Sequence, residues 1–131
     1  MVYSNSQYDQ IPLSQRFIRN YVRHAARIWY DFNFDSSSLW SDVNVNMSIF
    51  EYIWGTLFKE INIAENLEIL DKPVFLALGR YDFVVAPPES WNLLCPKFQN
   101  LSMHIFEYSG HSPFYEEPDL FDAKLLDWLS W

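Results

Sequence analysis

Cysteine is almost absent from this sequence of 131 residues. Cys95 is the only one, which excludes an intramolecular disulfide and a metal site built from several cysteines. It lies in the apolar stretch Leu93-Leu94-Cys95-Pro96 with no base nearby in the sequence, which favours a buried filler over a reactive thiol. We therefore expect no metal and no cofactor, and the scarcity of cysteine suits a reducing cytoplasm.

Basic residues and long apolar runs are also scarce. Nine Lys and Arg against 17 Asp and Glu give a net charge of −8. A helical spacing of three and four places four of the basic residues on one face: Arg16, Arg19, Arg23 and Arg27. Such a row fits a nucleic-acid or membrane patch, or a solvated helix face balanced by the acidic rest of the chain, and we favour the solvated face. No apolar run approaches the length of a membrane span, and residues 1–10 lack the apolar core of a signal peptide. We expect no nucleic-acid or membrane partner and a cytoplasmic location.

What the sequence does contain is apolar and aromatic surface. Half of the residues are apolar and 19% are aromatic, which excludes a disordered chain. The length is that of one domain. Small domains bury a smaller share of their surface than large ones, so we expect another chain to cover some of these aromatic side chains.

The amino-terminal half predicts two helices separated by a polar loop. Apolar residues follow a 3.6-residue period over residues 13–32, and residues 31–46 are rich in Asp, Asn and Ser. A second periodic stretch covers residues 48–61, with Ser48 and Glu51 in the spacing of a capping box.

The carboxyl-terminal half predicts alternating strands and helices. A short helical turn over residues 66–70 precedes Val74–Gly79, which is continuously apolar, the pattern of a strand buried on both faces in a parallel sheet. A helix over 89–98 and a strand over 102–108 follow. Asp119 is predicted to cap a last helix, whose expected buried stripe is Leu120, Phe121, Leu125, Leu126, Trp128 and Leu129.

Asp82 and His111 each follow one of the two predicted strands. Sites in parallel sheets form outside the carboxyl ends of the strands, so these side chains should lie side by side. An imidazole can take a proton near neutral pH when a carboxylate fixes its tautomer. Glu107 and Glu116 are alternative partners, but Glu107 is expected on the surface and Glu116 in the turn into the last helix. The sequence thus predicts Asp82 and His111 as catalytic residues.

Two stretches make a family resemblance specific. Residues 72–87 (KPVFLALGRYDFVVAP) and residues 106–121 (FEYSGHSPFYEEPDLF) resemble the carboxyl-terminal part of an α/β-hydrolase of the proline iminopeptidase-like group. In that family an Asp follows the penultimate strand and a His follows the last, and Asp82 and His111 match these positions. The resemblance implies an α/β fold, a truncated α/β-hydrolase. Residues 1–65 would be part of a helical cap, and residues 66–131 the carboxyl-terminal portion of the core, a parallel strand-helix-strand-helix unit.

The family's serine nucleophile, in Gly-x-Ser-x-Gly, has no counterpart in this sequence. None of its three glycines, Gly55, Gly79 and Gly110, belongs to such a motif. Ser109 and Ser112 flank His111, and a residue beside the base in sequence is badly placed to be its nucleophile. We expect a hydrolase fragment that is inactive alone, or alternatively a non-catalytic module that associates with other chains.

The resemblance also implies a partner. In the family, further strands precede this segment, so the apolar strand Val74–Gly79 would lose its inner neighbour and offer an edge for pairing. We expect either self-association or docking of an amino-terminal hydrolase half through this edge. The expected substrate is a small ester or a short peptide, and the sequence does not specify which. Glu51, Glu60 and Glu65 are candidates to hold a substrate amine by charge alone.

Overall fold

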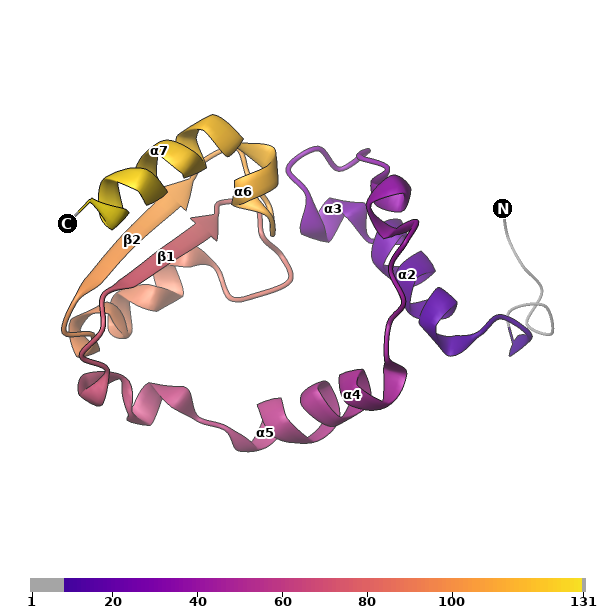
Figure 1. Cartoon of the computed structure of the whole chain (residues 1–131), viewed down its shortest axis with the longest axis horizontal. Helices are drawn as coiled ribbons and strands as arrows, with labels where there is room; N and C mark the ends of the chain where they lie inside the picture. Colours follow the sequence, from indigo (N-terminus) through magenta and orange to yellow (C-terminus); the bar gives the residue numbers. More distant parts are fainter. Residues whose placement is uncertain (1–8, 131) are drawn as a thin grey trace. The chain divides into compact units, whose positions relative to one another are not determined.

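The computed structural model describes residues 9–130 (Figure 1). Residues 1–8 of the expected cap segment and Trp131 lie outside the described residues. The chain divides into two compact units, one with residues up to 25 and 35–62, the other with residues 26–34 and 63 onward. Residues 26–34 are thus grouped with the carboxyl-terminal part of the chain. The cap assignment of residues 1–65 stays a prediction.

The first expected helix is shorter than its periodicity suggests. Two helices replace it, α2 (Leu13–Arg23) and α3 (Ala25–Ile28), with His24 between them at φ −97° and ψ 28°. The helix does not continue to residue 32, because the carbonyl of Ile28 accepts a hydrogen bond from the backbone of His111. A partner distant in sequence therefore overrides the local apolar period.

The first unit also contains a 3₁₀ turn, η1 (Ser36–Trp40), inside the expected loop. Asp35 caps it by accepting a hydrogen bond from Ser37 N, and the hydrogen bonds from Ser37 lower the pKa of the Asp35 carboxyl. Rings from separate elements pack together in this unit. Phe17 lies 4.6 Å from Phe50, and Tyr21 lies 4.8 Å from Trp40, measured between ring centroids.

The second expected helix is present as three consecutive segments, α4 (Met47–Tyr52), the π-helical turn η2 (Ile53–Leu57) and α5 (Phe58–Glu60). The predicted capping box at Ser48 is wrong. Asn46 is the N-cap, and its side-chain oxygen accepts a hydrogen bond from Ile49 N at 3.2 Å. The helix starts one residue earlier than predicted because Asn46 supplies a capping oxygen.

The second unit is built on two parallel strands, as predicted. After two 3₁₀ turns, η3 (Ile63–Glu65) and η4 (Leu67–Ile69), β1 (Val74–Gly79) pairs with β2 (Leu101–Phe106). The register runs from Val74 opposite Leu101 to Gly79 opposite Phe106. Phe106 is completely buried, with Ile28, Trp29, Leu67 and Leu78 the other buried apolar residues of this unit.

Helical elements cover both faces of this sheet. Helix α7 (Pro118–Leu129) lies along the strands (Figure 1), and the rings of Phe121 and Trp128 lie 5.9 and 5.7 Å from Phe75 of β1. Because side chains alternate along a strand, Met103 is on the other face, where its sulfur lies 3.6 Å from Cys95 Sγ.

Three predictions for these helices are wrong. The expected helix over residues 89–98 is two 3₁₀ turns, η5 (Pro88–Leu93) and η6 (Cys95–Lys97), because Pro96 has no N–H to continue an α-helical ladder. The last helix is preceded by α6 (Pro113–Glu116), and its N-cap is Glu117 instead of Asp119. Its expected buried stripe is only half-buried at Phe121, Leu125 and Trp128, and Leu120, Leu126 and Leu129 are exposed over a sheet that has two strands within the described residues.

Across residues 9–130, no helix is both long and apolar enough to span a membrane.

Candidate active site

Asp82 and His111 meet beyond the carboxyl ends of the two strands. His111 Nδ1 lies 2.7 Å from Asp82 Oδ2. The Asp82 side chain is 9% exposed and that of His111 38%, so the carboxylate is covered while part of the ring faces solvent. Because Nδ1 contacts the carboxylate, Nε2 is the ring nitrogen left to exchange a proton with another group.

The Asp82 carboxylate is held by the backbone that follows it. Its second oxygen, Oδ1, accepts hydrogen bonds from Val84 N at 2.8 Å and Val85 N at 3.3 Å. The two oxygens therefore have different partners. Oδ1 binds the backbone of the loop after β1, and Oδ2 contacts the imidazole. Sequence reasoning predicted the pair but not this division.

The turn that carries His111 is fixed by backbone contacts. Its own N–H donates to Ile28 O at 2.5 Å, and Tyr81 N donates to Ser109 O at 2.9 Å. A Cβ added to Gly79 would overlap the Gly110 carbonyl, and one added to Gly110 would overlap the Ile28 carbonyl. Both positions need glycine because three chain segments approach there backbone to backbone.

The carboxylates of Glu116 and Glu117 accept hydrogen bonds from other N–H and O–H groups of this turn, a role that the sequence did not predict. Glu116 Oε2 accepts hydrogen bonds from Gly110 N and Ser112 N, and Glu117 Oε2 accepts from Tyr108 N and the Ser109 hydroxyl. Neither Glu107 nor Glu116 is the carboxylate that contacts the imidazole. A glutamate at the start of a helix, a few residues after a Gly turn, is the sequence signal that could have indicated a capping role.

A surface ion-pair cluster joins the ends of the strands. Arg80 Nε and Nη2 donate to the two oxygens of Glu107 at 2.9 and 2.8 Å, and Arg80 also pairs with Glu89. The hydrogen bond from Arg80 lowers the pKa of the Glu107 carboxyl, and the same bond raises the pKa of Arg80. Glu107 is therefore an exposed surface residue, as expected, and it pairs with an arginine two residues before Asp82.

Comparisons with known proteins find relatives by sequence, although no family model matches the chain. The AB hydrolase superfamily protein YclE of Bacillus subtilis (strain 168) is 36% identical over 121 residues, which are 92% of this chain and 43% of YclE. A proline iminopeptidase of Heyndrickxia coagulans is 30% identical over 95 residues, 65% of this chain and 31% of the enzyme.

A solved structure gives the same answer for the fold. An alpha/beta fold family hydrolase from Bacillus anthracis str. Sterne matches with a TM-score of 0.71 and 21% identity, over 95% of this chain and 45% of that one. The fold is that of the α/β hydrolases. The sequence relatives support an α/β-hydrolase origin, and the chain spans less than half of the length of either curated relative.

The two serines beside His111 differ in their surroundings. Ser109 is completely buried, and its hydroxyl donates to Glu117 Oε2 at 2.6 Å. Ser112 is the N-cap residue of α6 and is adjacent to the base itself. The hydrolase motif Gly-x-Ser-x-Gly is absent from the sequence.

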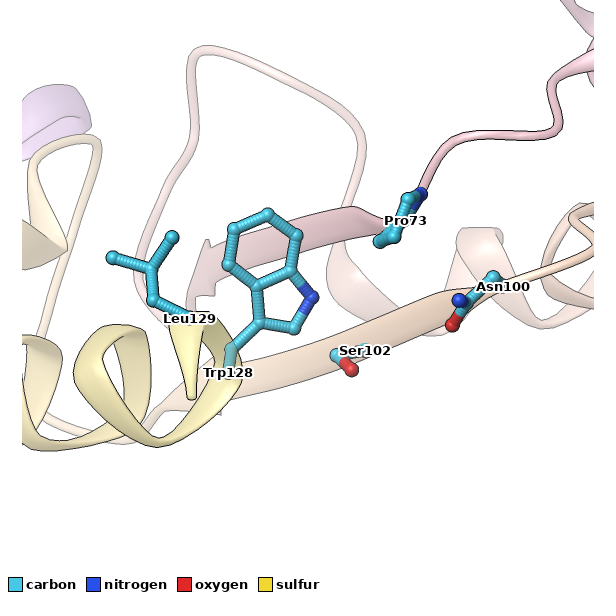
Figure 2. A pocket seen from close by; sticks show the side chains of 5 residues that line it. All are labelled: Pro73, Asn100, Ser102, Trp128 and Leu129. Atoms are coloured by element: carbon cyan, nitrogen blue, oxygen red, sulfur yellow. The ribbon is translucent and has the colours of Figure 1, made fainter. Parts of the chain in front are cut away.

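Two hollows lie in this unit of the hydrolase fold. The larger, of about 400 Å³, is lined by Pro73, Asn100, Ser102, Trp128 and Leu129 (Figure 2). Pro73, Asn100 and Ser102 lie at the amino-terminal ends of the strands, at the end of the sheet opposite Asp82 and His111, and Trp128 and Leu129 are the last residues of α7. The smaller, of about 250 Å³, is next to the His111 turn and is lined by Trp29, Tyr30, Asp31, Phe34, Tyr108, Tyr115 and Glu116.

The acidic side chains are the candidates for holding a metal ion or a substrate amine. Within the described part of the chain, no group of three or more His, Cys, Asp or Glu side chains could hold a metal ion. Glu51 and Glu60 belong to the first unit and Glu65 to the second, and all three are exposed. Their role as amine ligands stays a prediction.

Proposed function

We propose that this chain carries the acid–base pair of a serine-type α/β-hydrolase that acts on an ester or a peptide amide. The observation that carries the proposal is the 2.7 Å contact between His111 Nδ1 and Asp82 Oδ2 at the carboxyl ends of two parallel strands. The order Asp then His along the chain is that of the α/β-hydrolase triad.

His111 acts as the general base in this scheme. Its Nε2 takes the proton from a serine hydroxyl as the oxygen attacks the substrate carbonyl, and it returns the proton to the leaving alcohol or amine. Asp82 keeps the proton of the ring on Nδ1 and stabilises the imidazolium without becoming protonated. A second turn of the same proton transfer, with water as nucleophile, releases the acid.

The chain alone is inactive in this proposal, because it has no Gly-x-Ser-x-Gly motif. An amino-terminal hydrolase segment supplies the serine and the oxyanion donors. The finer specificity, prolyl aminopeptidase-like, draws on the relative named proline iminopeptidase. The cytoplasmic location rests on the composition.

The test is a hydrolysis assay with a nitrophenyl ester and a prolyl amide. The chain is assayed alone and mixed with the separately produced part of YclE that it does not match. We expect turnover only in the mixture. His111→Ala or Asp82→Asn should lower that turnover about 10²–10⁴-fold, and a serine-directed inhibitor should abolish it. If the chain alone shows turnover that is lost in His111→Ala but is insensitive to such inhibitors, the proposal that this chain lacks a nucleophile is refuted.

We also propose an associating module as a second function, which the open strand edges favour. Within the described residues the sheet has only two strands, so each has an edge without a neighbouring strand. Val74 N and Arg80 N donate to Asn100 O and Phe106 O. Backbone groups alternate along a strand, so the N–H groups of Phe75 and Ala77 face away from β2. That edge is where a second copy or an amino-terminal half would pair.

A proline substitution tests the edge directly. Ala77→Pro removes an N–H from the outer edge, whereas Leu76→Pro removes one from the β1–β2 ladder and is the matched control. We expect the unsubstituted chain to elute as an assembly in size exclusion, Ala77→Pro to elute as a folded monomer, and Leu76→Pro to unfold. A clean, stable monomer of the unsubstituted chain would contradict the proposal.

A further inference from the structure

Three consecutive backbone N–H groups around the imidazole all have acceptors. Gly110 N donates to Glu116 Oε2 at 2.8 Å, and Ser112 N donates to the same oxygen at 3.3 Å. The N–H of His111 between them donates to Ile28 O at 2.5 Å. The two neighbours of His111 are therefore held by one carboxylate oxygen, and the residue itself by residue 28.

The same carboxylate also holds the segment that contacts His111. Glu116 Oε1 accepts a hydrogen bond from Tyr30 N at 2.6 Å, and Tyr30 lies two residues after Ile28. Glu116 thus joins the His111 turn to the segment whose carbonyl fixes the His111 backbone. Both of its oxygens are in use, on different partners.

Glu117 makes a different kind of contact. Within the described residues only Oε2 is used, and it accepts hydrogen bonds from Tyr108 N at 3.0 Å and from the Ser109 hydroxyl at 2.6 Å. These groups belong to the start of the turn, before Gly110. Glu117 therefore binds the residues just after the strand, while Glu116 binds the backbone on both sides of the histidine.

We infer that Glu116 is a positioning residue for His111: its two carboxylate oxygens hold the backbone so that the imidazole reaches Asp82. The inference rests on the proposed role of His111. Hydrogen bonds that backbone N–H groups donate to an ionised carboxylate are shorter and stronger than neutral ones, so one side chain can hold N–H groups of two chain segments. The turn has no helical or sheet ladder of its own to do this.

The difference between the two glutamates gives a matched pair of variants. In Glu116→Gln only one of the two side-chain positions remains an acceptor, so the new NH₂ group must face either Tyr30 N or the Gly110 and Ser112 N–H groups. In Glu117→Gln the single remaining oxygen can keep both contacts. Each variant removes one charge, so charge alone cannot explain a difference between them.

The measurement is a nuclear magnetic resonance spectrum of the whole chain, which needs no catalytic activity. The readout is the downfield resonance of the His111 Nδ1 proton, recorded with the ring protonated and assigned by its loss in Asp82→Asn. We expect Glu116→Gln to lose or shift this resonance and the amide signals of residues 110–112, with the signals of β1 and β2 unchanged. Glu117→Gln should keep the Nδ1 resonance.

Every outcome decides the inference. An Nδ1 resonance in Glu116→Gln that is unchanged from the parent chain, or equal losses in both variants, overturns it. If Glu116→Gln does not fold, Glu116→Asp replaces it. That variant keeps the charge and both oxygens on a shorter side chain, and it should weaken the resonance; an unchanged resonance again overturns the inference.

Failure of the proposed function is recognised separately. If His111→Ala leaves the turnover of the mixture with the YclE part unchanged, the catalytic role of His111 is wrong, whatever the spectrum shows. If His111→Ala abolishes turnover but Glu116→Gln keeps both turnover and the Nδ1 resonance, only the positioning role is wrong.

Discussion

The two units of the chain both contain packed rings, and they differ in how closely their backbone segments approach. In the first unit, rings pack on rings: Phe17 contacts Tyr21, Trp40 and Phe50, while large apolar side chains such as Trp54 and Phe58 stay more than half exposed. In the second unit, backbone meets backbone at Gly79, Gly110 and Ile28, above the completely buried Phe106.

This difference separates positions that tolerate change from positions that do not. Ring contacts can readjust when one side chain changes, because side chains have alternative rotamers. A close contact between backbone segments that leaves no room for a Cβ atom cannot readjust in this way. The proposed catalytic pair lies in the second unit, where these backbone contacts hold the two loops that carry Asp82 and His111, as a proton-transfer site requires.

The largest effect is expected at the buried core of the second unit. Phe106→Ala should lower the free energy of unfolding by about 3–5 kcal/mol, through lost apolar burial and the cavity left behind. Phe58→Ala, at a residue of the first unit that is 56% exposed, should change it by no more than about 0.5 kcal/mol. Urea unfolding followed by circular dichroism measures both, and equal losses would contradict the contrast between the units.

Glycine to alanine substitutions sharpen the comparison next. Gly79→Ala should cost about 1–3 kcal/mol, because the added methyl group overlaps the Gly110 carbonyl and pushes the His111 turn away. A Cβ on Gly55, in the π-helical turn η2, meets nothing within 4 Å. Gly55→Ala should therefore raise stability by up to about 1 kcal/mol. Comparing the midpoints of urea unfolding checks this, and a destabilising Gly55→Ala would show that the helix is not open there.

A smaller effect is expected for the ring cluster of the first unit. Phe17→Leu keeps most of the apolar volume and removes the ring contacts with Trp40 and Phe50, so it should cost about 0.5–1.5 kcal/mol. Phe17→Ala removes the volume too, and should cost more. Thermal unfolding of the two variants separates the two contributions. If Phe17→Leu matched the parent chain, the rings would add nothing beyond apolar burial.

The smallest effect concerns pH. Burial beside Phe75 lowers the pKa of His104 below its ordinary value of 6.5, the charge of Lys124 adds to this, and Asp127 opposes it. The unfolded chain then binds a proton at a pH where the folded chain does not. The His104 contribution is thus complete above pH 6.5 and is lost as the pH falls through the lowered folded value.

Replacing His104 separates its contribution to the pH dependence of stability from the contributions of other titratable groups. The melting temperature of the parent chain should fall more between pH 7.5 and 5.5 than that of His104→Phe, which keeps every other titratable group. Thermal melts at several pH values measure the difference. A His104→Phe chain with the same pH slope would show that His104 does not contribute.

Much of the second unit was predictable. The continuous apolar run Val74–Gly79 predicted a parallel strand, which is confirmed, but only Leu78 and Gly79 are buried, because the sheet has two strands within the described residues. The Gly turn after the second strand predicted the place of His111. The helix predicted over residues 89–98 is wrong, because an apolar period is compatible with both α-helical and 3₁₀ turns and does not take account of Pro96, which lacks an N–H.

By itself, the sequence determined the strand order, the parallel pairing and the positions of Asp82 and His111 just beyond the strand ends. Those follow from local patterns of apolar and turn residues, which span only a few positions. The tertiary structure alone decided that Ile28 ends its helix to bind the His111 backbone, and that Glu116 binds Tyr30, 86 positions away. Hydrogen bonds of this kind join residues that are far apart along the chain, so no local sequence pattern predicts them.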